Sequence, residues 1–115
     1  MAMIVANLSA LKNTVYSMKN SLEFMNVDIQ KLNCLIDARE YLEDAKEELK
    51  LYGTEKGMPT AIPYMERAWK RLDLMKKYAE KDMQHDSDAV NLLIVAQCNV
   101  VMPMLDQVIN KSLER

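Results

Sequence analysis

The sequence predicts an all-α protein, namely an antiparallel helical bundle of three to four helices with a long, heptad-patterned N-terminal helix. The first observation is that 115 residues contain only two glycines and three prolines, all but Pro103 between residues 53 and 63. A strand-rich domain needs more turns than these residues supply. The second is a globular composition, 50% apolar and 28% charged, which can build a core. We therefore expect one domain over residues 1–115.

The N-terminal segment carries a heptad seam. No Gly or Pro occurs between Met3 and Tyr52, and apolar residues recur there in alternating steps of four and three. This spacing is typical of helices that pack along one another. The seam consists of Ile4, Leu8, Leu11, Val15, Met18, Leu22, Met25, Ile29, Leu32 and Ile36. Beyond it the apolar frame slips and continues through Leu35, Ala38, Leu42, Ala45, Leu49 and Tyr52.

Residues 3–52 form either one helix or two. Asn26 and Asp28 could act as a C-terminal Asn and an N-cap Asp, which would place a turn between them. The seam nevertheless passes this point in phase, so we predict one continuous helix, roughly 70 Å long at 1.5 Å per residue. A turn at Asn26 would instead give an up-and-down four-helix bundle that closes as a monomer.

The remaining chain is predicted to contain a loop and two further helices. Residues 53–62 form the loop, and Pro63 suits the first turn of a helix that runs to about Gln84. The polar residues 84–88 should end that helix and cap the next. The last helix has no charged residue from Ala89 to Leu105, and Pro103 should kink or divide it. We expect it to be buried in a core and not in a membrane, since its Asn and Gln side chains and Pro103 are unfavourable in hydrocarbon.

Charge and cysteine content favour a cytoplasmic protein. The net charge of −2 provides no field that would attract nucleic acid or an anionic membrane. The first basic side chain is Lys12, so the N-terminus lacks the charged flank of a signal sequence. Cys34 and Cys98 lie in apolar stretches and are predicted to be reduced, buried thiols.

No catalytic, metal or cofactor motif is found, and we predict a protein that is not an enzyme. His85 is the only histidine and lies at a helix end, where a capping or solvated role suits it better than metal binding. The acidic cluster that includes Glu40 and Glu43 is interpreted as a solvated face with interleaved lysines. An enzyme that acts through these two carboxylates remains the less favoured alternative.

The predicted function is protein–protein interaction through apolar helical surfaces. If the first helix is continuous, the shorter helices leave part of its seam uncovered, which a homodimer or a protein partner would bury. The predicted interface residues are Ile4, Leu8, Leu11, Val15, Met18, Leu22 and Met25. The alternative is nucleic-acid binding through a basic face within residues 67–81. Its anion-contacting residues would be Arg67, Lys70, Arg71, Lys77 and Lys81.

Overall fold

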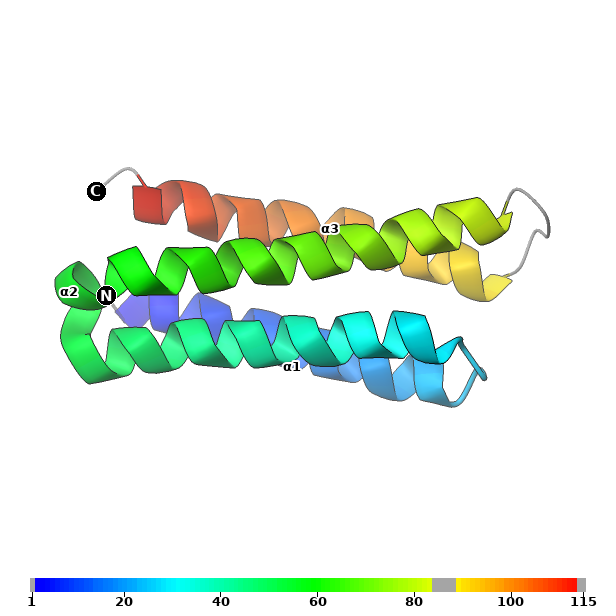
Figure 1. Ribbon diagram of the computed structural model, residues 1–115, viewed down its shortest axis with the longest axis horizontal. Coiled ribbons are helices and arrows are strands. Elements are labelled where there is room, and N and C mark those ends of the chain that lie inside the picture. Colours follow the sequence, from blue (N-terminus) through cyan, green and yellow to red (C-terminus); the bar gives the residue numbers. More distant parts are fainter. Residues whose placement is uncertain (1, 84–88, 114–115) are drawn as a thin grey trace.

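Three helices make up the part of the chain that the computed structural model describes, residues 2–83 and 89–113 (Figure 1). They are α1 (Ala2–Glu23), α2 (Ile29–Met83) and α3 (Ala89–Leu113). Helix α2 is interrupted at Gly53, whose φ of 80° and ψ of 171° are not helical. No strand occurs in the described residues, and the all-α prediction is confirmed.

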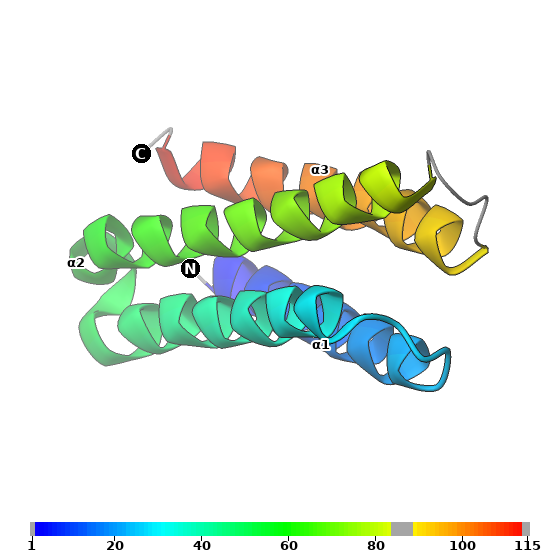
Figure 2. The same ribbon diagram turned by 45° about the vertical axis from the view of Figure 1, so that its right-hand side comes forward.

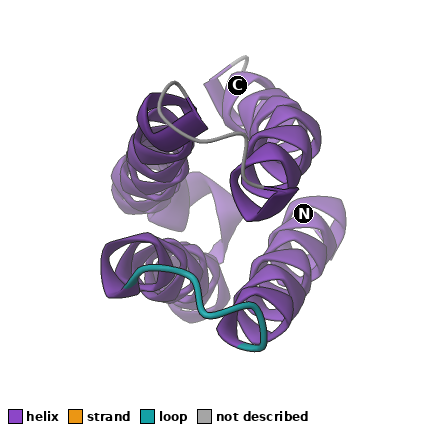
Figure 3. Ribbon diagram, turned by 90° about the vertical axis from the view of Figure 1, so that its right-hand side faces the viewer, coloured by secondary structure: helices purple, strands orange, loops and turns teal. Residues whose placement is uncertain are grey.

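The helices pack side by side around one core. Figures 1 and 2 show the two parts of α2 on one side of the bundle and α1 and α3 on the other, with consecutive segments running in opposite directions. An end-on view shows all of them around a common interior (Figure 3). The molecule measures 47 × 24 × 18 Å. Its largest fully buried side chains include Leu8, Leu22, Leu42, Met65, Leu72, Met75, Ile94 and Leu105.

The prediction of one helix over residues 3–52 is wrong, because the chain turns after Glu23. Asn26 has a φ of 54°, a left-handed conformation that Asn tolerates better than most residues. The carbonyl of Asp28 accepts hydrogen bonds from the N–H groups of Lys31 and Leu32 at 3.0 and 3.2 Å, which starts α2 as an N-terminal cap does. A seam that stays in phase therefore does not require an unbroken helix.

The two halves of the seam, before and after the turn, differ in burial. In α1, Leu8 and Val15 are fully buried. Met25 in the turn and Ile29 just after it are exposed, and from there on the second apolar frame supplies the core residues. The buried residues of that frame are Leu35, Ala38, Leu42, Ala45 and Leu49. The frame slip in the sequence thus marks the point at which a new helix presents its own core side.

The predicted loop at residues 53–62 is also wrong, since this stretch is helical apart from Gly53. The backbone of Gly53 occupies a region that only glycine adopts without strain, and there the chain reverses at the end of the bundle (Figure 1). A Cβ atom on Gly57 would lie 2.5 Å from the carbonyl oxygen of Glu48. The Thr60 hydroxyl donates to the Gly57 carbonyl at 3.0 Å. The two glycines therefore permit a tight helical hairpin.

Helix α3 is continuous from Ala89 to Leu113 and is not divided at Pro103. Pro103 lies on the exposed side of this helix. The capping roles predicted for residues 84–88, and the role of His85, lie outside the described residues.

Candidate interaction face on helices α1 and α3

The charged residues of α1 all lie on the side of the helix that faces α2. Lys12 Nζ is 2.7 Å from a carboxylate oxygen of Glu43 on α2. Lys19 lies over the ring of Tyr16 at 5.7 Å, and Arg39 of α2 covers the same ring at 4.2 Å. These contacts leave the side of α1 that faces α3 without charge. The charged residues of α1 are Lys12, Lys19 and Glu23.

Helix α3 is similarly poor in charge, since it carries only Asp106 and Lys111. The prediction that its uncharged part is buried is only partly right. Leu92 is 52% exposed, Val100 62% and Met104 44%, because the bundle covers one side of α3 and leaves the other open. This helix is also long and apolar enough to span a membrane, a criterion that the core helix of a soluble protein also meets.

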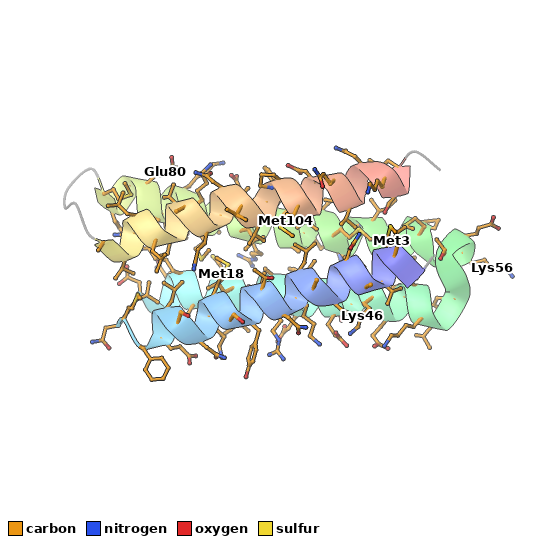
Figure 4. All side chains as sticks on the ribbon, turned by 180° about the vertical axis from the view of Figure 1, so that it is seen from behind. Met3, Met18, Lys46, Lys56, Glu80 and Met104 are labelled. Atoms are coloured by element: carbon orange, nitrogen blue, oxygen red, sulfur yellow. The ribbon has the colours of Figure 1, made fainter. Side chains whose placement is uncertain are left out.

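Two hollows lie in line between α1 and α3 and form one groove, and Figure 4 shows this side with Met3, Met18 and Met104 labelled. The larger, of about 380 Å³, is lined by Thr14, Ser17, Met18, Ser21, Ala96, Gln97, Val100 and Val101. The smaller, of about 120 Å³, is lined by Asn7, Ala10, Leu11, Met104, Gln107, Val108 and Lys111. Lys111, at one end, is the one charged residue in this lining. We call this surface the α1/α3 face.

Polar contacts do not join the two walls of this groove. Within residues 2–83 and 89–113, no side-chain hydrogen bond or ion pair links α1 to α3. The two helices also contact each other less extensively than either contacts α2. Gln97 lines the larger hollow, and its buried Oε1 has no hydrogen-bond donor among the described residues. Buried acceptors usually have a partner, so this amide marks an incompletely satisfied position.

Most of the predicted interface residues are buried within the single chain. Ile4 is half-buried and Met25 is 44% exposed at the turn. The others are buried in the chain's own core, and two of them, Leu11 and Met18, also border the hollows of the α1/α3 face. These buried residues are Leu8, Leu11, Val15, Met18 and Leu22. The seam of α1 thus faces the interior, and the α1/α3 face lies beside it on the outer surface.

The predicted basic residues are brought together only in part. Four of them line a hollow of about 360 Å³ between the two parts of α2, and Lys81 is not in its lining. The wall also contains Tyr41, Leu74 and the acidic Asp73. The four basic residues in the wall are Arg67, Lys70, Arg71 and Lys77.

Most of these cations already have a neighbour. Arg71 pairs with Asp37 at 3.3 Å, and Lys77 pairs with Asp73 at 2.9 Å. The Arg67 guanidinium lies 5.3 Å from the centre of the Tyr64 ring. Such pairing lowers the net positive field that an anionic ligand would meet.

A buried polar cluster at the turn end of the bundle was not predicted. Lys31 is 3% exposed, and its Nζ donates to Asp82 at 2.5 Å, to Asn91 at 2.8 Å and to Asp28 at 3.2 Å. Burial acts to lower the pKa of Lys31, but the hydrogen bonds to Asp82 and Asp28 outweigh it, and the pKa is raised. A lysine cannot be identified as buried from sequence spacing when its partners come from the turn before α2, from the far end of α2 and from α3.

Burial and ion pairing shift the pKa values of Cys34, Cys98 and Glu43. Burial raises the pKa of Cys98 to about 12 and also raises that of Cys34, so both thiols stay protonated at neutral pH. Hydrogen bonding to Lys12 lowers the pKa of Glu43 to about 2, and Lys46 adds to this effect. Over the described ranges, no group of three or more His, Cys, Asp or Glu is placed to hold a metal ion.

In comparisons with known proteins, no family model, no curated protein and no solved structure matches this chain. A function must therefore be inferred from the surface itself. The α1/α3 face and the basic hollow of α2 are the two surfaces to weigh. The first has a single charged residue, Lys111, and the second has several charged residues, of which Arg71, Lys77 and Asp73 form ion pairs.

Proposed function

We propose that this protein is a non-enzymatic, cytoplasmic protein–protein interaction module, an antiparallel up-and-down bundle that binds a protein partner through the α1/α3 face. The observation that carries the proposal is the exposed apolar surface of α3 beside an uncharged side of α1. Val100 and Met104, which line the groove, are 62% and 44% exposed. No charged residue lines the groove except Lys111.

The absence of charge is the informative part of this observation. Charged residues normally make up roughly a quarter to a third of a protein surface. They are depleted at the centre of protein–protein interfaces, where methionine and aromatic residues are enriched. This chain places the great majority of its charges on α2 and in the connecting segments. The α2 side therefore carries most of the charge, while the opposite side shares with interface centres the depletion of charged residues.

The shape of the groove favours a helical partner. It follows α1 and α3 along their length, and its walls include the short side chains of Ala10, Ser17, Ser21 and Ala96. Short side chains allow the backbone of a third helix to approach closely. An apolar helix face that lies in a groove between two helices is a recurrent mode of recognition.

Site-specific photo-crosslinking in living cells tests the proposal. A photoreactive amino acid replaces Val100 on the α1/α3 face in one variant and Ile29 at the turn in the control. The two side chains are similarly exposed, 62% and 66%. We expect a discrete protein adduct from position 100 and none from position 29. Equal labelling at both positions, or adducts with lipid only, would contradict the proposal.

Nucleic-acid binding is the second candidate, because the structure adds aromatic rings to the basic residues. Tyr41 and Tyr64 stack with ring centres 6.4 Å apart beside the basic hollow, and bases stack on such rings. The triple substitution of Lys70, Arg71 and Lys77 by Glu should then abolish salt-sensitive binding of nucleic acid. If no such binding exists in the unmodified protein at low salt, this candidate is removed.

A further inference from the structure

We infer that the basic hollow between the two parts of α2 binds a single phosphate group, held by Arg67, Lys70 and Arg71. The two parts of α2 lie on the side of the bundle opposite α1 and α3 (Figures 1 and 2). The inference therefore goes beyond the proposed function and does not depend on the α1/α3 face. The ligand chemistry is that of inorganic phosphate or a phosphate monoester, and not that of a nucleic-acid strand.

Unbalanced charge is the first argument. The lining of this hollow contains four cations and one carboxylate, that of Asp73, which pairs with Lys77. In the described part of the chain, no ion pair reaches Arg67 or Lys70. Like charges three and four residues apart on a helix repel each other, as Arg67 does with Lys70 and Arg71. An anion between them removes this repulsion.

The neighbours of the two arginines hold them in place without neutralising the hollow. The Arg67 guanidinium lies 5.3 Å from the centre of the Tyr64 ring, which itself stacks on Tyr41. An aromatic ring carries no net charge, so Arg67 keeps its own. Arg71 pairs with Asp37 through Nε at 3.3 Å, which leaves its two terminal nitrogen atoms as donors. Planar guanidinium groups match the oxygen atoms of a phosphate in pairs.

The spacing of the cations selects one phosphate group and not a row of them. Arg67 and Arg71 are one helical turn apart, about 6 Å along the axis, with Lys70 between them. The fourth cation, Lys77, lies about 9 Å further along and is paired with Asp73. A longer polyanion that followed α2 would meet the Asp73 carboxylate, which repels it. The unpaired charge thus lies at one point of the hollow.

Titration of the isotope-labelled full chain with inorganic phosphate tests the inference, with the amide and arginine Nε–H resonances followed by NMR at constant ionic strength. We expect saturable shifts at residues 67–71 and at Tyr41. Adenosine monophosphate and adenosine are the further probes, and adenosine alone should not bind. Equal affinity for phosphate and adenosine monophosphate would identify the phosphate group alone as the ligand. Affinity for adenosine monophosphate that is about ten-fold higher would show that the base also stacks on Tyr41.

Lys70→Glu and Lys81→Glu form a matched pair of variants. Both lysines are exposed on α2 and both substitutions change the net charge equally, but only Lys70 lines the hollow. Lys70→Glu should weaken phosphate binding about ten-fold or more, the usual contribution of a hydrogen bond to a charged group. Lys81→Glu should change it less than about two-fold, because salt screens distant charges. Circular dichroism checks that both variants fold.

Arg67→Lys separates recognition of phosphate from general attraction of anions. This substitution keeps the charge but removes the planar guanidinium group, so binding should weaken several-fold. Unchanged affinity would mean that the hollow contributes only positive charge, which would contradict a built phosphate site.

Three other results would overturn the inference. The first is the lack of saturable shifts with both phosphate and adenosine monophosphate. The second is equal weakening by Lys70→Glu and Lys81→Glu, because binding would then reflect the overall charge of α2. The third is an oligonucleotide that binds at these residues far more tightly than phosphate, which would favour the nucleic-acid candidate. Photo-crosslinking at Val100 on α3 reports separately on the proposed function.

Discussion

The two long sides of this bundle are built in opposite ways. On one side, the two parts of α2 are joined by a tight hairpin at Gly53 and Gly57 and carry most of the charged residues, several of them in ion pairs. On the other, α1 and α3 are not consecutive in the chain, and their groove has neither ion pairs nor cross-helix hydrogen bonds in the described residues.

This difference teaches that the absence of charge on α3 is not explained by burial alone. A helix that is apolar on all sides is normally surrounded by its own protein, yet α3 leaves Val100 and Met104 exposed. Apolar side chains exposed together on one face often mark an interaction site. The contrast between the two sides therefore points to the α1/α3 face.

The largest effect should come from placing a charge on the core side of α1. If the fold tolerated that charge, the contrast between the buried and the exposed part of the seam would not hold. Leu22 is fully buried, whereas Ile29, on the same heptad seam, is 66% exposed. We expect Leu22→Asp to destabilise the fold by about 4 kcal/mol or more, because a buried carboxylate has no partner there. Ile29→Asp should change the free energy of unfolding by less than about 0.5 kcal/mol. Urea denaturation measures both, and equal effects would refute the observed turn.

The next effect concerns the hairpin that closes the α2 side. The Cβ atom of Gly57→Ala would lie 2.5 Å from the Glu48 carbonyl oxygen, which forces the two parts of α2 apart. We expect a loss of about 2–3 kcal/mol, measured by urea denaturation. Lys56→Ala, at an exposed neighbouring position, is the control. A more stable Gly57→Ala protein would mean that the α2 side is not closely packed.

Lys31 should have a smaller effect at the turn end, where α2 and α3 are joined. Lys31→Met removes the donor to Asp82 and to the buried Asn91, and we expect a loss of about 2 kcal/mol. Because its pKa is raised above 10.5 in the folded state, this stabilisation is complete below pH 10.5 and is lost as the pH rises through the folded value.

Thermal melts from pH 8 upward, over roughly two to three pH units toward the pKa of lysine, test whether the ion pairs of Lys31 stabilise the fold. The exposed Lys50 provides the matched control, Lys50→Met. The difference between Lys31→Met and the unmodified protein should shrink at the alkaline end. A difference that is constant with pH would show that the ion pairs at Lys31 do not stabilise the fold.

The smallest effect is expected for Glu43, which links α1 to α2. Its folded pKa is about 2, below the usual 4.5, so its contribution is present above pH 4.5 and is lost as the pH falls toward 2. The side chain is 35% exposed, and screening limits the contribution to below about 1 kcal/mol. Glu43→Gln should therefore lower the melting temperature slightly at pH 7 and less at pH 2, and Glu66→Gln, at an exposed position, is the control.

The helical class and much of the core were predictable from the sequence, because both depend on local periodicity. The seam identified Leu8, Leu11, Val15, Met18 and Leu22, and the second frame identified Leu35 through Leu49. The turn at Asn26 is not predictable from the heptad pattern, because a short turn can leave that pattern in phase on either side of it. The helix after Gly53 was likewise missed, because glycine and proline signal a break without showing how short it is.

The candidate site was less predictable than the fold. The lack of charge from Ala89 to Leu105 was visible in the sequence, but it was interpreted as burial. Which side of a helix faces solvent depends on how many neighbours the bundle provides, and sequence periodicity does not supply that number. The same limit applies to Lys31, whose partners Asp82 and Asn91 come from distant parts of the chain.

The most direct test of whether a protein covers the α1/α3 face is the rate of methionine oxidation by dilute peroxide. The rate is measured on the native protein before any fractionation. Met104 on that face and Met25 at the turn have the same exposure in the single chain, 44%, so they form a matched pair. If the face is covered by a protein, Met104 should oxidise several-fold more slowly than Met25, and the two rates should become equal in Val100→Glu. Equal rates in the unmodified protein would contradict the account, because the face would then be open to solvent.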